Sequence, residues 1–271
     1  MKGSSVPPLD TAANIALMDA LTALSACAAQ AIKRTKWADD VRIKADGSPV
    51  TAADEAAEAV IRDGLARLAP TFPVISEEQG EQERPIVGRT PYFLVDPLDG
   101  TREFIAGRDE YTVNIALVAD GAPVLGIITA PALGLIWRGV VNRGAERMVL
   151  AADGRTSLPS AIHTRPRPTD GVIVVVSRSH LDARTQAYIE AMRPARTLAT
   201  GSSIKFCRVA EGGADLYPRL APTCDWDVAA GHAILVAAGG RVLAPDRTPL
   251  VYGTMELRIP AFVAWGDAAG V

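Results

Sequence analysis

The chain of 271 residues is 48% hydrophobic and 22% charged, proportions typical of a folded globular protein. Its 28 basic and 31 acidic residues give a formal charge of −3. That balance argues against a surface built to bind a nucleic acid polymer and favours a small-molecule partner. The length permits one large α/β domain or two smaller ones that share an interface.

Cysteine usage and hydropathy indicate a reducing compartment. Cys27, Cys207 and Cys224 are odd in number, far apart and free of C-x-x-C spacing, so we expect neither a disulfide framework nor a zinc site. Residues 1–11 lack the pattern of a secretory signal. The apolar segment 11–32 is interrupted by four polar side chains, Asn14, Asp19, Ser25 and Gln30. We therefore expect no integral membrane segment and a cytoplasmic protein, with a peripheral position on the inner membrane left open.

The first half of the chain is predicted to contain two helices and a mostly antiparallel sheet. Residues 11–32 place apolar side chains at three- to four-residue spacing, as in an amphipathic helix. A second helix begins after Thr51, because Thr51 and Asp54 have the spacing of a capping box, and it ends before Pro70. Strands are predicted by short apolar runs at 73–75, 92–95, 111–118 and 123–130.

A polar, proline-rich stretch at 151–170 leads into a second half of different character. Residues 172–176 form an apolar run typical of a strand buried on both faces. The pattern then alternates between helices at 181–192, 202–211 and 228–238 and strands near Leu198, Leu216, Val242 and Phe262. We therefore predict an N-terminal α+β half at residues 1–155 and a C-terminal α/β half at residues 156–271.

The densest chemical pattern is the hexapeptide D-P-L-D-G-T at residues 96–101, directly after the strand at 92–95. Asp96 and Asp99 can converge on one point across the proline turn, with the Leu98 carbonyl facing it, and hard cations prefer such oxygen ligands. Gly100 lets the backbone approach a ligand, and Thr101 offers a hydroxyl and an amide to a phosphate or a water. The same residue types are common turn formers, so by itself the hexapeptide fits a plain turn equally well.

Three other acids have a similar pair of interpretations. Glu77 follows the strand at 73–75 and could simply begin a solvated loop. Asp227, at the start of the helix at 228–238, and Asp54 could each cap a helix. Their positions at strand ends and helix starts nevertheless allow separate segments to converge on one ligand.

In combination these segments resemble the inositol monophosphatase superfamily. The matching motifs are T-A-A-D at 51–54, S-E-E at 76–78, D-P-L-D-G-T at 96–101 and W-D-V-A-A-G at 226–231. The resemblance runs from about residue 11 to near the C-terminus. It implies an α/β protein with a layered αβαβα, sugar-phosphatase-like fold and the activity of a lithium-inhibited, Mg²⁺-dependent phosphomonoesterase. A homodimer is compatible with it.

The resemblance also implies a role for each motif residue. Two or three Mg²⁺ ions would be held by Glu77, Asp96, the Leu98 carbonyl, Asp99 and Asp227. Asp54 and Thr101 would orient the attacking water, and the amides of Gly100 and Thr101 would bind the phosphate. The N-terminal half would then carry most of the metal ligands, and the C-terminal half the substrate pocket and the last ligand.

Within the superfamily, residues 201–219 resemble the 3'(2'),5'-bisphosphate nucleotidase branch, chiefly through Lys205. This implies hydrolysis of the 3'-phosphate of adenosine 3',5'-bisphosphate, a by-product of sulfate assimilation, to AMP and phosphate. The substrate-binding residues would be Gly100, Thr101, Arg178, Ser202, Lys205 and Asp227. Arg178 and Lys205 would bind the second phosphate, although either could be an ordinary surface cation. Arg102 and Asp225 depart from the branch, and Asp225, beside Trp226, leaves the substrate preference open.

Two other functions stay open. An inositol monophosphatase or fructose-1,6-bisphosphatase would use the same metals with a different pocket. A catalytically silent protein that binds a nucleotide or phosphosugar would be expected to lack at least one metal ligand, and none is missing here. His180 and His232 are accompanied by no G-x-S-x-G elbow, so a structural role is expected for both.

Overall fold

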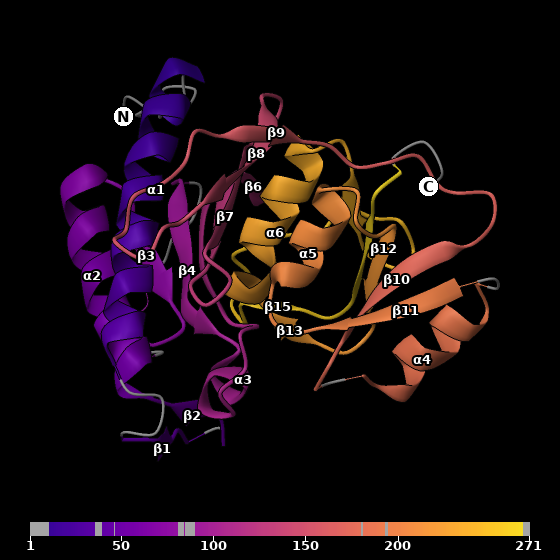
Figure 1. Ribbon diagram of the computed structural model, residues 1–271, viewed down its shortest axis with the longest axis horizontal. Coiled ribbons are helices and arrows are strands. Elements are labelled where there is room, and N and C mark those ends of the chain that lie inside the picture. The colour runs from indigo at the N-terminus through magenta and orange to yellow at the C-terminus, as the bar shows by residue number, and fades with distance from the viewer. Residues whose placement is uncertain are drawn as a thin grey trace, which may run out of the picture.

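Five alternating layers of helix and sheet make up the fold. The computed structural model describes residues 11–35, 40–45, 47–80, 84, 90–179, 181–192 and 195–267, with side chains from residue 15 onward. Figure 1 shows two sheets with a pair of helices between them, a second pair of helices outside the first sheet, and one helix outside the second sheet. This is the layered αβαβα arrangement expected from the resemblance, which is thereby confirmed.

The first sheet is seven-stranded and follows chain order. Its strands are β3 (Val74–Ser76), β4 (Tyr92–Asp99), β5 (Thr112–Ala119), β6 (Ala122–Ala130), β7 (Leu135–Val140), β8 (Gly144–Val149) and β9 (Ser160–Ile162). Only β3 and β4 pair in parallel, and every other neighbouring pair is antiparallel. The expectation of a mostly antiparallel sheet is confirmed, but the strands β7 to β9 were not predicted.

Helices α1 (Thr11–Arg34) and α2 (Ala52–Leu68) cover the outer face of this sheet. The segment 15–34 of α1 is long and apolar enough to cross a membrane, with a mean hydropathy of 1.6. Half of that segment is buried within the protein, where α1 packs against α2 and β6. In this fold α1 therefore has the packing of a core helix.

The inner face of the first sheet is covered by α6 (Asp225–Ala237), with α5 (Ile204–Ala210) beside it. Glycines allow this contact to be unusually close. A Cβ on Gly126 of β6 would lie 2.3 Å from the Ala230 carbonyl oxygen, and a Cβ on Gly231 would lie 2.3 Å from the Phe206 ring. The backbone of α6 is thus held directly against the sheet, which fixes the position of its first turn.

The second sheet has the order β11-β10-β12-β16-β14. Its strands are β10 (Val172–Ser177), β11 (Ala195–Thr200), β12 (Leu216–Arg219), β14 (Arg241–Leu243) and β16 (Phe262–Trp265). Strand β10 pairs in parallel with both β11 and β12, and α4 (Ala183–Glu190) packs on the outside against β12. The sheets change over between residues 162 and 172, and the division of the chain into two halves at residues 155 and 156 stays a prediction.

Small elements complete the fold around one end of the two sheets. They are the hairpin of β1 (Arg42–Ile43) and β2 (Pro49–Val50), the short helix α3 (Thr101–Ile105), and the pair β13 (Thr223–Cys224) and β15 (Arg258–Ile259). Helix α3 contacts β2, and β13 leads directly into α6. These elements bring the predicted site residues together.

Candidate metal centre and adjoining cavity

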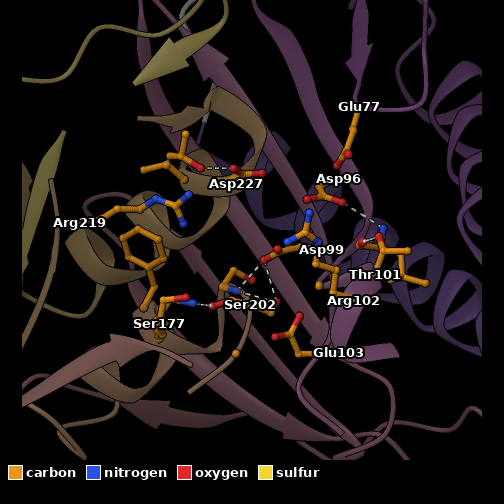
Figure 2. A pocket seen from close by; sticks show the side chains of 18 of the residues that line it. Glu77, Asp96, Asp99, Thr101, Arg102, Glu103, Ser177, Ser202, Arg219 and Asp227 are labelled. Atoms are coloured by element: carbon orange, nitrogen blue, oxygen red, sulfur yellow. Dashed lines mark hydrogen bonds between the residues drawn. The ribbon is translucent and has the colours of Figure 1, made fainter. Parts of the chain in front are cut away.

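Three carboxylates from separate segments converge at the carboxyl end of β3 and β4. Because these strands run in parallel, Glu77, which follows β3, lies beside Asp96 of β4, and the Glu77 amide donates to the Val95 carbonyl at 3.1 Å. The third acid is Asp227, in the first turn of α6. One oxygen from each of Glu77, Asp96 and Asp227 lies within 4.8 Å of the other two, and Figure 2 shows the three side chains at one side of a cavity.

The charges of this cluster are poorly compensated by the protein. Burial is the main cause that raises the pKa of each acid, to about 7 for Glu77 and well above the usual range for Asp96. Mutual repulsion adds to the shifts of Asp96 and Glu77, whereas Lys44, whose Nζ lies 3.2 Å from Glu77, opposes that of Glu77. Converging carboxylate oxygens, of one buried and two partly buried acids, fit a hard divalent cation such as Mg²⁺, which would neutralise them.

Asp99 lies next to this cluster but is oriented by the C-terminal half of the chain. Its Oδ2 accepts from the Ser202 hydroxyl at 2.7 Å and from the Ser203 amide at 2.6 Å. The register of β4 against β5 shifts between Asp96 and Asp99, so the two acids are not placed by a regular pleat. Asp99 and Leu98 both line the cavity, although Asp99 is not one of the three acids whose oxygens converge.

Asp54 combines the two interpretations that its sequence position allows. Its Oδ2 accepts from the Thr51 amide at 2.8 Å and from the Thr51 hydroxyl at 2.6 Å, as in a capping box at the start of α2. Its Oδ1 accepts from the Thr101 hydroxyl at 3.1 Å, and the same hydroxyl lies 3.1 Å from the Leu98 carbonyl oxygen. The cap therefore holds the Asp54 carboxylate in place, with its second oxygen facing the hexapeptide 96–101. Burial raises the pKa of Asp54.

Asp227 combines two roles in the same way. Its Oδ2 accepts from the Thr223 hydroxyl and from the Cys224 amide, the latter at 3.1 Å, which completes a capping box for α6. The carboxylate nevertheless belongs to the three-acid cluster. Helix capping thus holds the carboxylate in place and does not exclude it from the candidate site.

The cavity beside the acids has a volume of about 290 Å³. Of the predicted site residues it is lined by Glu77, Asp96, Leu98, Asp99, Gly100, Thr101, Ser202, Lys205 and Asp227. Gly100 has a φ of 92°, a backbone conformation that glycine adopts without strain, and it begins α3. The cavity therefore brings together residues that lie far apart in the sequence, since Glu77 and Asp227 are separated by 150 positions.

Besides Arg102, two cations line the same cavity. Lys205 of α5 is 3% exposed, its Nζ donates to the Ser202 carbonyl, and it lies 5.3 Å from the centre of the Tyr217 ring. Arg219, at the end of β12, was not predicted as a site residue; its Nε is buried and has no hydrogen-bond partner among the described residues. Figure 2 shows its guanidinium directed into the cavity, across from Thr101. Its place at a strand end was the signal that could have identified it.

Arg178, predicted to bind the second phosphate, is paired with a carboxylate in this structure. It is not among the described residues that line the cavity. Its guanidinium instead forms two hydrogen bonds with Glu110, from Nε at 2.7 Å and from Nη2 at 2.9 Å. A cation that is already paired with a carboxylate is less available to a phosphate.

Of the remaining residues singled out from the sequence, two lie apart from the cavity, one lies outside the described residues and one lines the cavity. Asp225 is fully buried and points into the protein, where its Oδ2 accepts from the Gly253 amide at 2.8 Å. His232 of α6 is half-buried and its Nδ1 lies 2.9 Å from the Tyr252 hydroxyl. His180 lies outside the described residues. Arg102 lines the cavity.

Carboxylates for a hard cation and buried cations for an anion, on a layered αβαβα fold, define a metal-dependent phosphatase. The sequence profile of the inositol monophosphatase family matches residues 12–268. The chain belongs to that family.

Known relatives and structures agree with this assignment. The chain is 45% identical to the 3'(2'),5'-bisphosphate nucleotidase CysQ of Shigella flexneri and 44% identical to that of Escherichia coli strain K12, in each case over 80% of this chain and 85% of the relative. A crystal structure of CysQ from Bacteroides thetaiotaomicron, 37% identical, superimposes with a TM-score of 0.77 over 92% of this chain and 97% of that one. An inositol monophosphatase from Anabaena, 24% identical with a TM-score of 0.74 over 94% of this chain and 92% of that one, shares the fold.

Proposed function

We propose that this protein hydrolyses the 3'-phosphate of adenosine 3',5'-bisphosphate to AMP and phosphate in the presence of Mg²⁺. The observation that carries the proposal is a single cavity with two chemically different walls, an acidic one formed by Glu77, Asp96 and Asp227 and a cationic one formed by Lys205 and Arg219. A substrate with two phosphates needs both kinds of wall. The names of the relatives at 44–45% identity support the same choice.

The acidic wall is where the ester would be cleaved. Glu77, Asp96, Asp227, Asp99 and the Leu98 carbonyl would hold Mg²⁺, which when bound neutralises phosphate charge and lowers the pKa of a coordinated water. The Thr101 hydroxyl donates to Asp54, which leaves its oxygen free to accept a proton of the attacking water. Asp54, whose pKa is raised by burial, is placed by its bond with Thr101 to receive the Thr101 hydroxyl proton as that hydroxyl takes one from the water.

The cationic wall is where the second phosphate would bind. Lys205 is buried, Arg219 is half-buried, and the buried Nε of Arg219 is an unused donor among the described residues. An anion is the partner that such groups require, since a buried donor without a partner is costly. Ser202 and the backbone at Gly100 and Thr101, which line the same cavity, would complete the substrate site.

Several finer properties belong to the same proposal. We propose two or three Mg²⁺ ions and inhibition by lithium, both on the strength of the family. We also propose a cytoplasmic enzyme, with peripheral attachment to the inner membrane as an open variant, and a homodimer as an assembly to be tested by sedimentation or light scattering. The substrate itself is a small phosphate ester.

The proposal is tested by phosphate release from four substrates in Mg²⁺: adenosine 3',5'-bisphosphate, adenosine 3'-monophosphate, inositol 1-phosphate and fructose 1,6-bisphosphate. We expect the highest kcat/KM for the nucleotide bisphosphate. Lys205→Met and Arg219→Met should lower the ratio of kcat/KM for the bisphosphate over the 3'-monophosphate by about tenfold each, because a charge-assisted contact to the second phosphate is lost. The matched control is Arg208→Met, also in α5, whose guanidinium pairs with Glu211.

Other results would redirect the assignment. A preference for inositol 1-phosphate or fructose 1,6-bisphosphate would keep the metal site and reject the nucleotide. An unchanged ratio in both methionine variants would reject the cationic wall as the second phosphate site. Binding of the bisphosphate without turnover in any metal would favour a silent binding protein.

A further inference from the structure

A pair of residues outside the cavity connects the two halves of the site. Glu110 lies between α3 and β5, in the first part of the chain, and Arg178 follows β10, in the second. The Glu110 Oε2 accepts from the Arg178 Nε at 2.7 Å and from the Gly201 amide at 2.9 Å, while Oε1 accepts from the Arg178 Nη2 at 2.9 Å. The same Nη2 donates to the Ala199 carbonyl at 2.9 Å. Two of these bonds end on the segment 199–201, one from each member of the pair, and the other two join the pair itself.

The segment that these bonds hold leads directly into the site. Gly201 packs on Glu110 so closely that a Cβ would lie 2.8 Å from both the Cβ and the carbonyl oxygen of Glu110. The next residue, Ser202, has a φ of 53°, an unusual conformation for a residue with a side chain. Such a conformation persists where surrounding contacts impose it.

The loop at residues 201–203 serves both walls of the cavity. On the acidic side, the Ser202 hydroxyl and the Ser203 amide donate to Asp99. On the cationic side, the Ser202 carbonyl accepts from the Lys205 Nζ. A shift of this loop would therefore displace a candidate metal ligand and a candidate phosphate-binding cation together.

We infer that Glu110 and Arg178 are positioning residues that hold the loop 201–203 in its active geometry, and that Arg178 acts through Glu110 and not by contact with substrate. We call this pair, Glu110 with Arg178, the loop brace. The inference rests on the function proposed above for its kinetic consequences, but the contacts themselves do not depend on the substrate. It assigns Arg178 a role different from the phosphate contact expected from the sequence.

The geometry distinguishes the two roles of Arg178. Side chains of Glu110 and Arg178 are 24% and 39% exposed, so a surface pair of this kind contributes little to global stability by itself. Its value lies in the amide of Gly201, which Glu110 also binds, and in the lowered pKa of Glu110, which keeps the carboxylate charged. If Arg178 contacted the phosphate, Glu110 would compete with substrate and its removal would help binding.

The first test measures the loop without relying on activity. Hydrogen exchange of the amides in residues 200–203 should be about tenfold faster in Glu110→Ala and in Arg178→Ala, because each loses charge-assisted bonds that hold the segment. Glu110→Gln, which keeps an acceptor for the Gly201 amide, should be intermediate. The matched control is Arg165→Ala, since Arg165 forms the same two-bonded pair with Asp215, which also accepts a backbone amide, from Ile173. Unchanged exchange in both alanine variants would overturn the loop brace.

The second test measures the consequence for the site. Glu110→Ala and Arg178→Ala should each lower kcat/KM by on the order of tenfold to a hundredfold and raise the Mg²⁺ concentration for half-saturation, as loop misplacement predicts. The double variant should be no worse than either single one, because both act in one device. A loss in Arg178→Ala alone, with Glu110→Ala unimpaired, would show instead that Arg178 contacts the substrate. If the wild type turns over none of the substrates, the proposed function fails, while the exchange experiment and Mg²⁺ binding by calorimetry still decide on the loop brace.

Discussion

The two walls of the cavity differ in how completely the protein satisfies their charges. On the acidic wall, Glu77, Asp96 and Asp227 converge and burial raises all three pKa values. On the cationic wall, Lys205 donates to two backbone carbonyls, while Arg219 keeps one buried donor without a partner in the described part of the chain. The first wall needs a cation to neutralise its acids, and the second keeps a buried donor that an anion would satisfy. Changes to the acidic wall should therefore abolish the reaction, and changes to the cationic wall should alter selectivity.

The largest effect is expected at the centre of the acidic wall. Asp96→Asn removes one ligand charge and almost no volume, so turnover in Mg²⁺ should fall on the order of a thousandfold for every substrate. Phosphate release measured with saturating Mg²⁺ tests this. The bisphosphate-to-monophosphate preference should stay unchanged in the residual activity, because the cationic wall is intact.

The same variant separates the metal site from a merely structural acid. Without Mg²⁺, Asp96→Asn should unfold at an equal or higher temperature than the wild type, since it relieves a buried carboxylate that is repelled by its neighbours. Addition of Mg²⁺ should raise the Tm of the wild type and have little effect on the variant. Asp153→Asn, at an exposed pair with Arg155, is the control. Near-normal turnover in Asp96→Asn would reject the metal assignment.

A smaller effect on activity is expected from loss of the Thr101 hydroxyl, which links Asp54 to the hexapeptide 96–101. Thr101→Val keeps the shape of the side chain and removes the bond to Asp54, so kcat should fall about a hundredfold with little change in KM. Steady-state kinetics with adenosine 3',5'-bisphosphate tests it. Thr22→Val is a matched control, because Thr22 is also buried and hydrogen-bonded but lies on α1. An unchanged kcat would mean that Thr101 does not orient the attacking water.

The acidic wall was predictable because its geometry is encoded locally. Asp96 and Asp99 lie in the second half of β4, and Asp54 and Asp227 lie in the first turns of helices, so each carboxylate is placed by an element that the local sequence predicts. The interpretation of Asp54 and Asp227 as helix-capping acids is confirmed, and it does not compete with their proposed roles in the site. Capping positions a carboxylate, and a positioned carboxylate is what a metal site requires.

The cationic wall was harder to predict because it depends on tertiary neighbours. Glu110 and Arg178 are 68 positions apart, and nothing in the sequence indicates that they pair. This pairing decides what Arg178 can bind. Arg219 was overlooked because an arginine at the end of a short strand usually faces solvent. The strands β7 and β8 were missed because charged residues, Arg138 in β7 and Arg147 in β8, interrupt the apolar pattern.

The smallest effect is expected on stability, from His232 and Asp225, two polar groups of α6 that belong to neither wall. Burial lowers the pKa of His232 in α6 to about 4 and raises that of Asp225 to about 6. A neutral buried histidine gives stability that is present above its unfolded pKa of about 6.5 and lost as the pH falls, about 2 kcal/mol between pH 7 and 5. The raised pKa of Asp225 acts in the opposite direction, adding about 1 kcal/mol over the same interval as the carboxyl takes up a proton.

The pH-dependent contributions of His232 and Asp225 to stability should therefore partly cancel in the wild type. Substituting either residue should reveal the contribution of the other. Asp225→Asn removes the compensating proton uptake, so its unfolding free energy should fall more steeply from pH 7 to 5 than that of the wild type, by about 1 kcal/mol. His232→Gln keeps a hydrogen-bonding group for Tyr252 and should fall less steeply, by about 2 kcal/mol. Urea unfolding at pH 7 and pH 5 measures the change in unfolding free energy for each variant and for the wild type. Titration of the metal-site acids is common to all three proteins and so drops out of the comparison. A parallel pH dependence in all three proteins would show that Asp225 and His232 do not control stability. An altered substrate preference in either variant would show that these residues are not separate from the walls of the cavity.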